Sequence, residues 1–391
     1  MDVDLVIVGS GLAGNCLALS LAHTGLKIAM VEARSRQHLA NAPLGDRALA
    51  LAAGTVDALC ALESWQPIAH LATPIEKIHV SDQGHFGKTH LSAQTEKVKA
   101  LGYVIAARDL ENHLAEQVSR LENISHLHST RVVGIMADDE AVFVSAKEAD
   151  NAFNLRAKLV VGADGGQSSV RQLLDISQQS SDYGQTALVT TVKAMRPHQN
   201  VAYERFTSSG PLAMLPQGTH HCAVVWTRKT HEAQALMAGG DADFMAQLQA
   251  CFGYRLGELT LSAPRHAFPL SLIRAKAIVA NRCVIVGNAA HQLHPVAGQG
   301  FNLGLRDVVT LASMIQSQVN EDIGSRAFLA RYAKHREQDQ SRTIQFTDTL
   351  VHLFSNEWPA LSAARNVGLT VLDTLPFVKS LLAKHAMGRY W

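Results

Sequence analysis

The first 32 residues alternate between two apolar runs and a glycine-rich turn. Residues 3–8 are apolar except for Asp4 and are rich in β-branched side chains, which predicts a strand buried on both faces. A glycine turn follows, and a helical stretch then ends near Gly25. A second apolar run over residues 27–31 predicts another buried strand, which stops at Glu32. The pattern therefore predicts a strand–helix–strand unit.

The turn between these strands carries the glycines of a GxGxxG motif, Gly9, Gly11 and Gly14. The first would permit a tight turn, the second would let a pyrophosphate approach the backbone, and the third would let the helix pack closely on the strand. The phosphates would then lie at the positive end of the helix. Glu32, about 20 residues further on, could accept hydrogen bonds from the ribose hydroxyls. The unit predicts a dinucleotide site but does not separate FAD from NAD.

Two later segments repeat the arrangement of a buried strand that runs into a small-residue turn. The first leads into Asp164 and Gly165, and the second leads into Gly287 and Asn288. Asp164 could also cap the N-terminus of a helix in a tight turn, a structural role that is compatible with ligand binding. Both turns are therefore candidate parts of the cofactor site.

The second turn continues from Pro295 to a predicted helix start at Phe301 and Asn302. Gly298 and Gly300 would let backbone N–H groups approach a flat ligand. The helix start could stabilise negative charge, which reduced flavin carries on its N1–O2 edge. No second GxGxxG with a strand before it and a helix after it occurs in residues 100–391, so a permanently bound nicotinamide has no predicted site.

The C-terminal region, residues 341–391, is predicted to be helical, with apolar residues spaced four apart before Pro359 and again after it. Pro376 should break the later stripe. One interpretation is a helix packed on the protein body, and the other is a face for a partner protein or membrane lipid. The basic residues that could meet anionic headgroups are Lys379, Lys384 and Arg389.

Length, charge and cysteines narrow the class of protein. A chain of 391 residues favours more than one domain, and its formal net charge of +1 gives no concentrated basic surface for nucleic acid. Five scattered cysteines, never in a CxxC pair, argue against a disulfide framework and a zinc module. The start of the chain lacks a basic signal-peptide pattern, and no run of 18 apolar residues occurs, so we expect a cytoplasmic protein. His291 and His294 lack further ligands, so no metal is expected.

With these motifs in place, the sequence resembles the class A flavoprotein aromatic hydroxylases, the group that includes para-hydroxybenzoate hydroxylase. The family has an N-terminal GxGxxG, a central Asp-Gly and a late Gly-Asp, which match residues 9–14, Asp164-Gly165 and Gly287-Asn288. Asn288 departs from the family pattern, because it keeps the shape of Asp but loses the charge. The resemblance implies FAD as the cofactor.

The resemblance also implies roles for individual residues. Arg47 and Arg108 would contact the flavin nucleotide, and Asp164 would hold the ribityl chain. His294 would line the flavin face, whereas Arg205 could serve a strand salt bridge or the substrate side equally well. The residues that would border the isoalloxazine ring are Pro295, Gly298, Gly300 and Asn302. No catalytic residue can be assigned, since the tyrosine relay and the carboxylate-binding arginine of the para-hydroxybenzoate enzyme have no counterpart here.

The fold that the family implies is α/β with two domains: a GR2-type Rossmann-like FAD-binding domain and an inserted, mainly antiparallel β-sheet substrate domain, followed by C-terminal helices. Within the inserted part we expect strands over residues 176–271 and one helix near 242–252. The expected FAD-binding segments are 1–70, 98–175 and 272–340, and the expected substrate-domain segments are 71–97 and 176–271.

Five further segments are similar to the ubiquinone-biosynthesis hydroxylases, and most of all to those that act on 2-octaprenyl-6-methoxyphenol: residues 46–51, 79–85, 204–206, 210–216 and 348–354. This likeness implies NADPH or NADH as a transient reductant, with O₂ and a polyprenylated phenol as substrates. It also raises membership of a biosynthetic protein complex and peripheral contact with the inner face of the membrane.

Three alternatives stay open or are weakened by the sequence. The hydroxylation could occur at another ring position or on another aromatic substrate. A flavin-dependent halogenase would carry Trp-x-Trp, and the four tryptophans here never form that motif. A non-catalytic alternative is a flavin-bound scaffold subunit of a biosynthetic complex.

Overall fold

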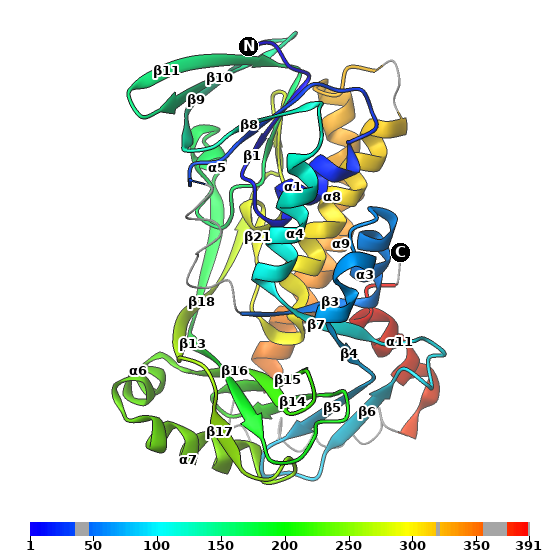
Figure 1. Cartoon of the computed structure of the whole chain (residues 1–391), viewed down its shortest axis with the longest axis vertical. Coiled ribbons are helices and arrows are strands. Elements are labelled where there is room, and N and C mark those ends of the chain that lie inside the picture. The colour runs from blue at the N-terminus through cyan, green and yellow to red at the C-terminus, as the bar shows by residue number, and fades with distance from the viewer. Residues whose placement is uncertain (36–46, 318–320, 355–373, 390–391) are drawn as a thin grey trace.

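The computed structural model describes residues 1–35, 47–317, 321–354 and 374–389. Two large sheets lie towards opposite ends of the long axis, and a bundle of helices runs beside them (Figure 1). The two longest strands of the second sheet, β13 (Gln178–Ala194) and β18 (His266–Ala275), extend along one side between the two ends. These two strands thus connect the nine-stranded sheet to the other end of the molecule.

A six-stranded sheet has the order β19-β20-β12-β1-β2-β8, and its central pairs are parallel. The two apolar runs near the N-terminus form β1 and β2, as predicted. The bounds of the strands are β1 (Leu5–Val8), β2 (Ile28–Val31), β8 (Ile124–Leu127), β12 (Leu159–Gly162), β19 (Val279–Ala280) and β20 (Cys283–Ile285).

This sheet is covered on both faces, which explains why its strands are apolar without alternation. Leu5 and Ile7 pack among the helices, whereas Val6 and Val8 pack against the small antiparallel sheet β11-β10-β9. The bounds of these covering elements are α1 (Leu12–Ser20), α4 (Ala107–Ser119), α8 (Gln299–Ser317), α9 (Arg326–Phe354), β9 (Thr130–Ala137), β10 (Val142–Glu148) and β11 (Asn151–Ala157).

A nine-stranded sheet has the order β21-β18-β13-β16-β15-β14-β5-β6, with β17 paired to β13. It is mainly antiparallel, as expected, although β14 and β5 pair in parallel. The bounds of its remaining strands are β5 (Lys77–Asp82), β6 (Lys88–Ser92), β14 (Val201–Thr207), β15 (Gly210–Gln217), β16 (His221–Lys229), β17 (Leu259–Leu261) and β21 (His291–Gln292).

One face of the nine-stranded sheet is closed by two helices, α6 (Thr230–Ala238) and α7 (Asp241–Phe252). The expected helix near 242–252 is α7, while α6 was not anticipated. Trp226 is fully buried and meets the Phe244 ring at 5.7 Å between centroids. Because side chains alternate along a strand, the other face of this sheet is left to line a cavity.

The remaining elements connect the two sheets. A three-stranded sheet has the order β3-β7-β4, so residues 73–75 pair with β7 although the expected substrate domain began at residue 71. No helix among the described residues is long and apolar enough to cross a membrane. The bounds are β3 (Ala48–Ala52), β4 (Thr73–Ile75), β7 (Gly102–Ala106), α3 (Ala53–Ala61), α5 (Ser169–Leu173), α11 (Pro376–Ala386), η1 (Gln66–Leu71), η2 (Gly287–Ala289) and η3 (Val296–Gly298).

Candidate active site

A cavity of about 1250 Å³ runs between the two large sheets. Its walls come from segments as distant in the chain as Val8 and Ala386. One end is lined by the glycine-rich turns, and the other by the free face of the nine-stranded sheet together with α9 and α11. The cavity therefore has a polar-backbone end and an apolar end.

The GxGxxG turn has the geometry that its spacing predicts. Gly9 has φ of 104°, and a Cβ there would lie 2.5 Å from the Ala163 carbonyl oxygen. A Cβ on Gly14 would lie 1.9 Å from the Gly9 oxygen, which explains the close packing of α1 on the turn. Gly11 lines the cavity, and a Cβ on it would meet no protein atom within 4 Å. The open side of this turn is thus the side where a pyrophosphate would lie.

Glu32 lies at the end of β2 and lines the cavity, as expected. Its Oε2 accepts hydrogen bonds from the Ser10 backbone N–H at 3.0 Å and from the Ser10 hydroxyl at 2.9 Å, and its Oε1 accepts two from Arg34. Burial alone would raise the pKa of Glu32, but the hydrogen bonds from Arg34 and Ser10 outweigh it and hold the pKa below its usual value. The side chain is therefore an anionic acceptor placed at the cavity rim.

Asp164 and Gly165 also line the cavity, at the start of α5. Asp164 Oδ2 accepts hydrogen bonds from the Ser169 hydroxyl at 2.9 Å and the Val170 N–H at 3.1 Å. Its other oxygen, Oδ1, is buried and has no hydrogen-bond partner among the described residues. An acceptor that is oriented by one oxygen and unsatisfied at the other suits a hydroxyl-bearing ligand such as a ribityl chain.

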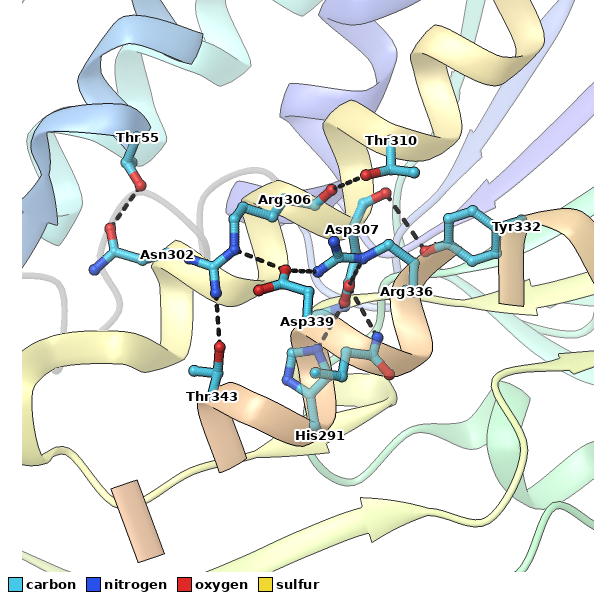
Figure 2. A network of polar contacts seen from close by, with 12 residues as sticks. Thr55, His291, Asn302, Arg306, Asp307, Thr310, Tyr332, Arg336, Asp339 and Thr343 are labelled. Atoms are coloured by element: carbon cyan, nitrogen blue, oxygen red, sulfur yellow. Dashed lines mark hydrogen bonds and ion pairs between the residues drawn. The ribbon is translucent and has the colours of Figure 1, made fainter. Parts of the chain in front are cut away.

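The Gly-Asn turn is held from below by a buried charge network, which Figure 2 shows. Gly287 and the exposed Asn288 line the cavity. Asp307 Oδ2 accepts hydrogen bonds from the Gly287 N–H at 3.1 Å and from His291 Nε2 at 2.7 Å. On its other side, Asp307 Oδ1 accepts from Arg336 at 2.8 Å. The turn is therefore fixed by a fully buried carboxylate.

The acidity of Asp307 follows from these contacts. Burial alone would raise its pKa, but the charges and hydrogen bonds of His291 and Arg336 outweigh burial and hold the pKa well below its usual value. Arg336 and Arg306 also share Asp339, at 2.7 and 2.9 Å. Sequence reasoning did not identify this network, although an adjacent Arg and Asp inside the apolar helix at 303–308 was a usable signal.

The segment expected to border the flavin ring forms one continuous stretch of the cavity wall. Pro295, Gly298, Gly300, Phe301 and Asn302 all line it. Asn302 donates from Nδ2 to the Gly298 carbonyl at 2.6 Å and accepts at Oδ1 from the Ala52 N–H at 3.0 Å, so it joins the start of α8 to β3.

The backbone of the same segment is strained and leaves room for a ligand. Ala297 has φ of 56°, a conformation that costs a non-glycine residue about 1 kcal/mol and is often found at functional sites. A Cβ on Gly300 would meet no protein atom within 4 Å, so the space beside the backbone is open.

Two arginines, Arg47 and Arg108, are expected to contact the flavin nucleotide. Arg47 is exposed and lines the cavity. Arg108, the second residue of α4, is absent from the cavity wall. The expected flavin-nucleotide contact is therefore supported by position for Arg47 and not for Arg108.

Two substrate-side candidates also lie away from the cavity wall. Arg205 points to the α7 side of the sheet, where its Nε donates to the Cys251 carbonyl at 2.8 Å. Strand alternation explains this placement, because neighbouring residues of a strand face opposite sides. His294 lies behind the wall: its Nδ1 accepts from the Val296 N–H at 3.1 Å, its ring meets Tyr183 edge-on, and burial lowers its pKa to about 4.

The two histidines that suggested a metal are engaged differently. His291 is bonded to Asp307, and no group of three or more potential metal ligands occurs in the described part of the chain. The residues that do converge are backbone donors, an unsatisfied Asp164 oxygen and open glycine faces. This donor set fits an elongated dinucleotide with a flat ring system, so the cavity fits FAD.

Comparisons with known proteins identify the family. The family model described as FAD binding domain matches residues 2–347. The ubiquinone hydroxylase UbiL of Rhodospirillum rubrum is 35% identical over 387 residues, covering 98% of this chain and 89% of that protein. The ubiquinone hydroxylase UbiM of Neisseria meningitidis is 30% identical over 393 residues, covering 98% of this chain and 84% of that protein.

Solved structures agree on the fold. The p-nitrophenol 4-monooxygenase PnpA of Pseudomonas putida superposes with a TM-score of 0.77 at 18% identity, covering 100% of this chain and 99% of that chain. At this identity the likeness shows the fold alone, which is the para-hydroxybenzoate hydroxylase-like arrangement that the sequence predicted. The chain therefore belongs to the FAD binding domain family, as an FAD-dependent aromatic monooxygenase of the class A hydroxylases.

Proposed function

We propose that this monooxygenase uses NADPH or NADH and O₂ to hydroxylate the ring of a polyprenyl phenol in ubiquinone biosynthesis, with 2-octaprenyl-6-methoxyphenol as the substrate. The names of its relatives, ubiquinone hydroxylases at 35% and 30% identity over nearly the whole chain, support the pathway. The structure of the cavity supports a substrate that joins an aromatic ring to a long apolar chain.

The observation that carries this proposal is the apolar end of the cavity. Beyond the flavin segment the wall is formed by aliphatic and aromatic side chains of the nine-stranded sheet and of α9 and α11. Burying apolar surface contributes roughly 25 cal/mol per Å², so an isoprenoid tail gains more from these walls than a small polar phenol would. The residues of this apolar end are Ile78, Val80, Leu91, Phe206, Leu215, Val225, Phe346, Leu350, Leu353, Leu382 and Ala386.

The chain's own residues divide the work of binding and of water exclusion. Residues at Gly9–Gly14 and Asp164, with the segment from Pro295 to Asn302, would hold FAD, which supplies electron transfer and oxygen activation when bound. The apolar walls would keep water from the reacting ring, and a dry site strengthens every electrostatic interaction within it. The protein thus contributes position and electrostatics.

We also propose that α11 contacts the membrane surface from which such a substrate would come. One face of α11 packs on the body through Ala383, whereas Phe377 and Leu381 are 81% and 58% exposed. The sequence predicts a helix break at Pro376. In the structure Leu375 is not helical, and α11 begins at Pro376 itself. Arg389 is engaged by Asp57 at 2.6 Å, so of the three basic residues considered it is the least suited to a headgroup.

Product analysis tests the catalytic proposal. Purified flavin-loaded protein is given NADH or NADPH, ¹⁸O₂ and a short-chain 2-prenyl-6-methoxyphenol, and we expect one ¹⁸O atom in the ring of the product. In a strain that lacks the protein, the unhydroxylated phenol should accumulate. Accumulation of a different ring intermediate would reassign the position, and flavin-loaded protein that never oxidises NAD(P)H with any phenol would favour the scaffold alternative.

Vesicle sedimentation tests the membrane contact. The double variant Phe377→Ser, Leu381→Ser should lose most of its binding to vesicles that contain anionic lipid. Met136→Ser is the matched control, because Met136 is 77% exposed on β9, at the other end of the molecule (Figure 1). Equal binding of the double variant and the wild type would end this proposal.

A further inference from the structure

Glu204 is an acid in the apolar end of the cavity. It lies in β14, whose residues Ala202, Glu204 and Phe206 line the cavity together with Tyr203. Its cross-strand neighbours are Val80 on β5 and Ala213 on β15, both of which line the same space. Glu204 thus places a carboxyl among aliphatic side chains.

Glu204 has no partner in the described part of the chain. Its Oε1 is buried without a hydrogen bond, and no ion pair reaches the side chain. Burial raises the pKa of Glu204 to about 7. An unpaired carboxyl with a buried oxygen is costly to a protein, and such groups are often found where a ligand completes their contacts.

The ionisable groups on the surrounding elements are engaged elsewhere. Arg205, its neighbour on β14, bonds to Cys251, and Asp82 at the end of β5 pairs with His85 at 3.3 Å. On α9, Asp348 accepts from the Tyr183 hydroxyl of β13 at 3.0 Å and lies 3.5 Å from His352. On the far side of β5 and β6, His79 and His90 contact each other at 2.6 Å. Nothing on the described elements neutralises Glu204.

The strand face that carries Glu204 is linked to the flavin segment through Phe206. Phe206, two residues along the same face of β14, packs in one buried cluster with Val296, which follows Pro295. A phenol that placed its ring beside the flavin segment and its tail along α9 would therefore bring its hydroxyl towards β14. The position is right for a group that acts on the phenol.

We propose that Glu204 is the catalytic base, which binds the phenolic hydroxyl of the substrate and takes its proton during hydroxylation. This inference rests on the proposed function. The phenol O–H bond breaks, and Oε1 gains the proton. The electron pair left on the phenolic oxygen flows into the ring as a ring carbon forms a bond to one atom of O₂. The O–O bond breaks, the other oxygen atom leaves as water, and NAD(P)H supplies the two electrons. When the ring carbon loses its hydrogen as a proton to water, Glu204 returns its proton to the ring oxygen and is again a carboxylate.

The same carboxyl sets a preference among substrates. A carboxylate-bearing ring would bring a second negative charge into an apolar space. No cation lines that space near Glu204 among the described residues, so the two like charges would repel each other. A neutral phenol instead offers a hydrogen-bond donor to the unsatisfied oxygen. The site therefore favours uncharged phenols over hydroxybenzoates.

The test compares Glu204→Gln with wild-type enzyme on two phenols. The first is a short-chain 2-prenyl-6-methoxyphenol, and the second is a fluorinated analogue whose hydroxyl is largely ionised at the assay pH. Gln keeps the size and hydrogen bonding of Glu but cannot take a proton, so we expect kcat for the first phenol to fall about 100-fold. The ratio of wild-type to variant rates should return to within about fivefold on the analogue, because it needs no base.

The pH profile gives a second, independent readout. Wild-type kcat/KM for the neutral phenol should rise through an ionisation near pH 7, and the profile of Glu204→Gln should lack it. Glu204→Asp, which keeps the acid but shortens the side chain, should keep the ionisation with a reduced rate. FAD content and NAD(P)H oxidation without substrate are measured alongside as checks on folding.

The outcomes separate this inference from the proposed function. A wild type that hydroxylates none of the phenols defeats the proposed function itself. An active wild type with an unchanged Glu204→Gln variant, or with equal losses on both phenols, overturns the role of Glu204 alone. If the variants do not fold, a wild-type profile on the neutral phenol without an ionisation between about pH 6 and 8 overturns it as well.

Discussion

Asp307, beneath the cofactor end of the cavity, and Glu204, in the sheet at the apolar end, are carboxyl groups that the fold treats in opposite ways. Asp307 accepts hydrogen bonds from Gly287, His291 and Arg336, and its pKa is held well below the usual value. Glu204 has none of these contacts, and burial raises its pKa to about 7. The hydrogen-bonded carboxylate of Asp307 fixes a backbone turn, whereas the unpaired carboxyl of Glu204 is left able to bind a ligand.

The difference extends to the regions around them. The cofactor end is built from turns that several independent contacts hold in place. These contacts come from closely packed glycines, from Asn302 and from the Asp307 network. The apolar end is mostly aliphatic and aromatic, and Glu204 is the carboxyl among the described residues that line it. A cofactor that is always the same needs fixed donors, while a substrate that arrives and leaves needs one group whose protonation can change.

Removal of Asp307 should have the largest effect. Asp307→Ala leaves His291 and Arg336 buried without their shared acceptor, and we expect a loss of about 3 to 5 kcal/mol in unfolding free energy, with loss of bound FAD. Urea unfolding and flavin absorbance measure both. Asp150→Ala, at an exposed position, is the control and should change stability by less than about 0.5 kcal/mol. If Asp307→Ala were as stable as wild type and still bound FAD, the Asp307 network would not be what fixes the cofactor turn.

Two glycine variants separate folding from cofactor binding. Gly14→Ala forces a Cβ to 1.9 Å from the Gly9 oxygen and should destabilise the protein by about 3 kcal/mol. Gly11→Ala meets no protein atom, so its stability without FAD should be unchanged. FAD affinity of Gly11→Ala should nevertheless fall at least about tenfold, since the methyl group occupies the pyrophosphate side of the turn. Unchanged affinity, measured by fluorescence titration of the apoprotein, would move the cofactor away from this turn.

The pH dependence of stability sharpens the contrast. The folded protein holds the Glu204 proton more tightly than the unfolded chain, because the pKa rises from 4.5 to about 7 on folding. Unfolding free energy is therefore lost as pH increases from about 4.5 to 7, and stays lost above it. Glu204→Gln avoids the loss, so it should be more stable than wild type by about 3 kcal/mol at pH 8 and about equal at pH 4. A constant difference between the two at every pH would contradict an isolated carboxyl.

Arg205→Gln should have the smallest effect. It removes a hydrogen bond to the Cys251 carbonyl on the far side of the sheet, worth about 1 kcal/mol. FAD affinity and the hydroxylation pH profile should match wild type, because the side chain does not reach the cavity wall. A shifted pH profile in this variant would show that the charge of Arg205 is felt through the sheet.

The cofactor end could be read from the sequence because its chemistry is local. Gly9, Gly11 and Gly14 act on backbone within one turn, so their spacing alone carries the geometry. The segment from Pro295 to Asn302 is equally continuous along the chain, and it lies on the wall as one piece.

The apolar end could not be read in the same way, because its residues come together only through sheet pairing. The sequence left Arg205 equally suited to a strand salt bridge or the substrate side, whereas strand alternation turns Glu204 and Phe206 towards the cavity. That alternation is visible in the sequence, but which of the two faces is enclosed depends on α6 and α7, and α6 was not foreseen. The partners of Asp307 likewise lie on a separate helix, α9.

The cavity has walls from segments as far apart as Val8 and Ala386, so it exists only in the folded protein. The supply of FAD should therefore affect the stability of the protein. An unfolded chain has no such cavity, so bound FAD adds RT ln(1 + [FAD]/Kd) to the unfolding free energy, about 2.7 kcal/mol at a hundredfold excess over Kd. Flavin shortage would then lower the amount of this enzyme as well as its turnover, because the empty form would be the one that proteases degrade.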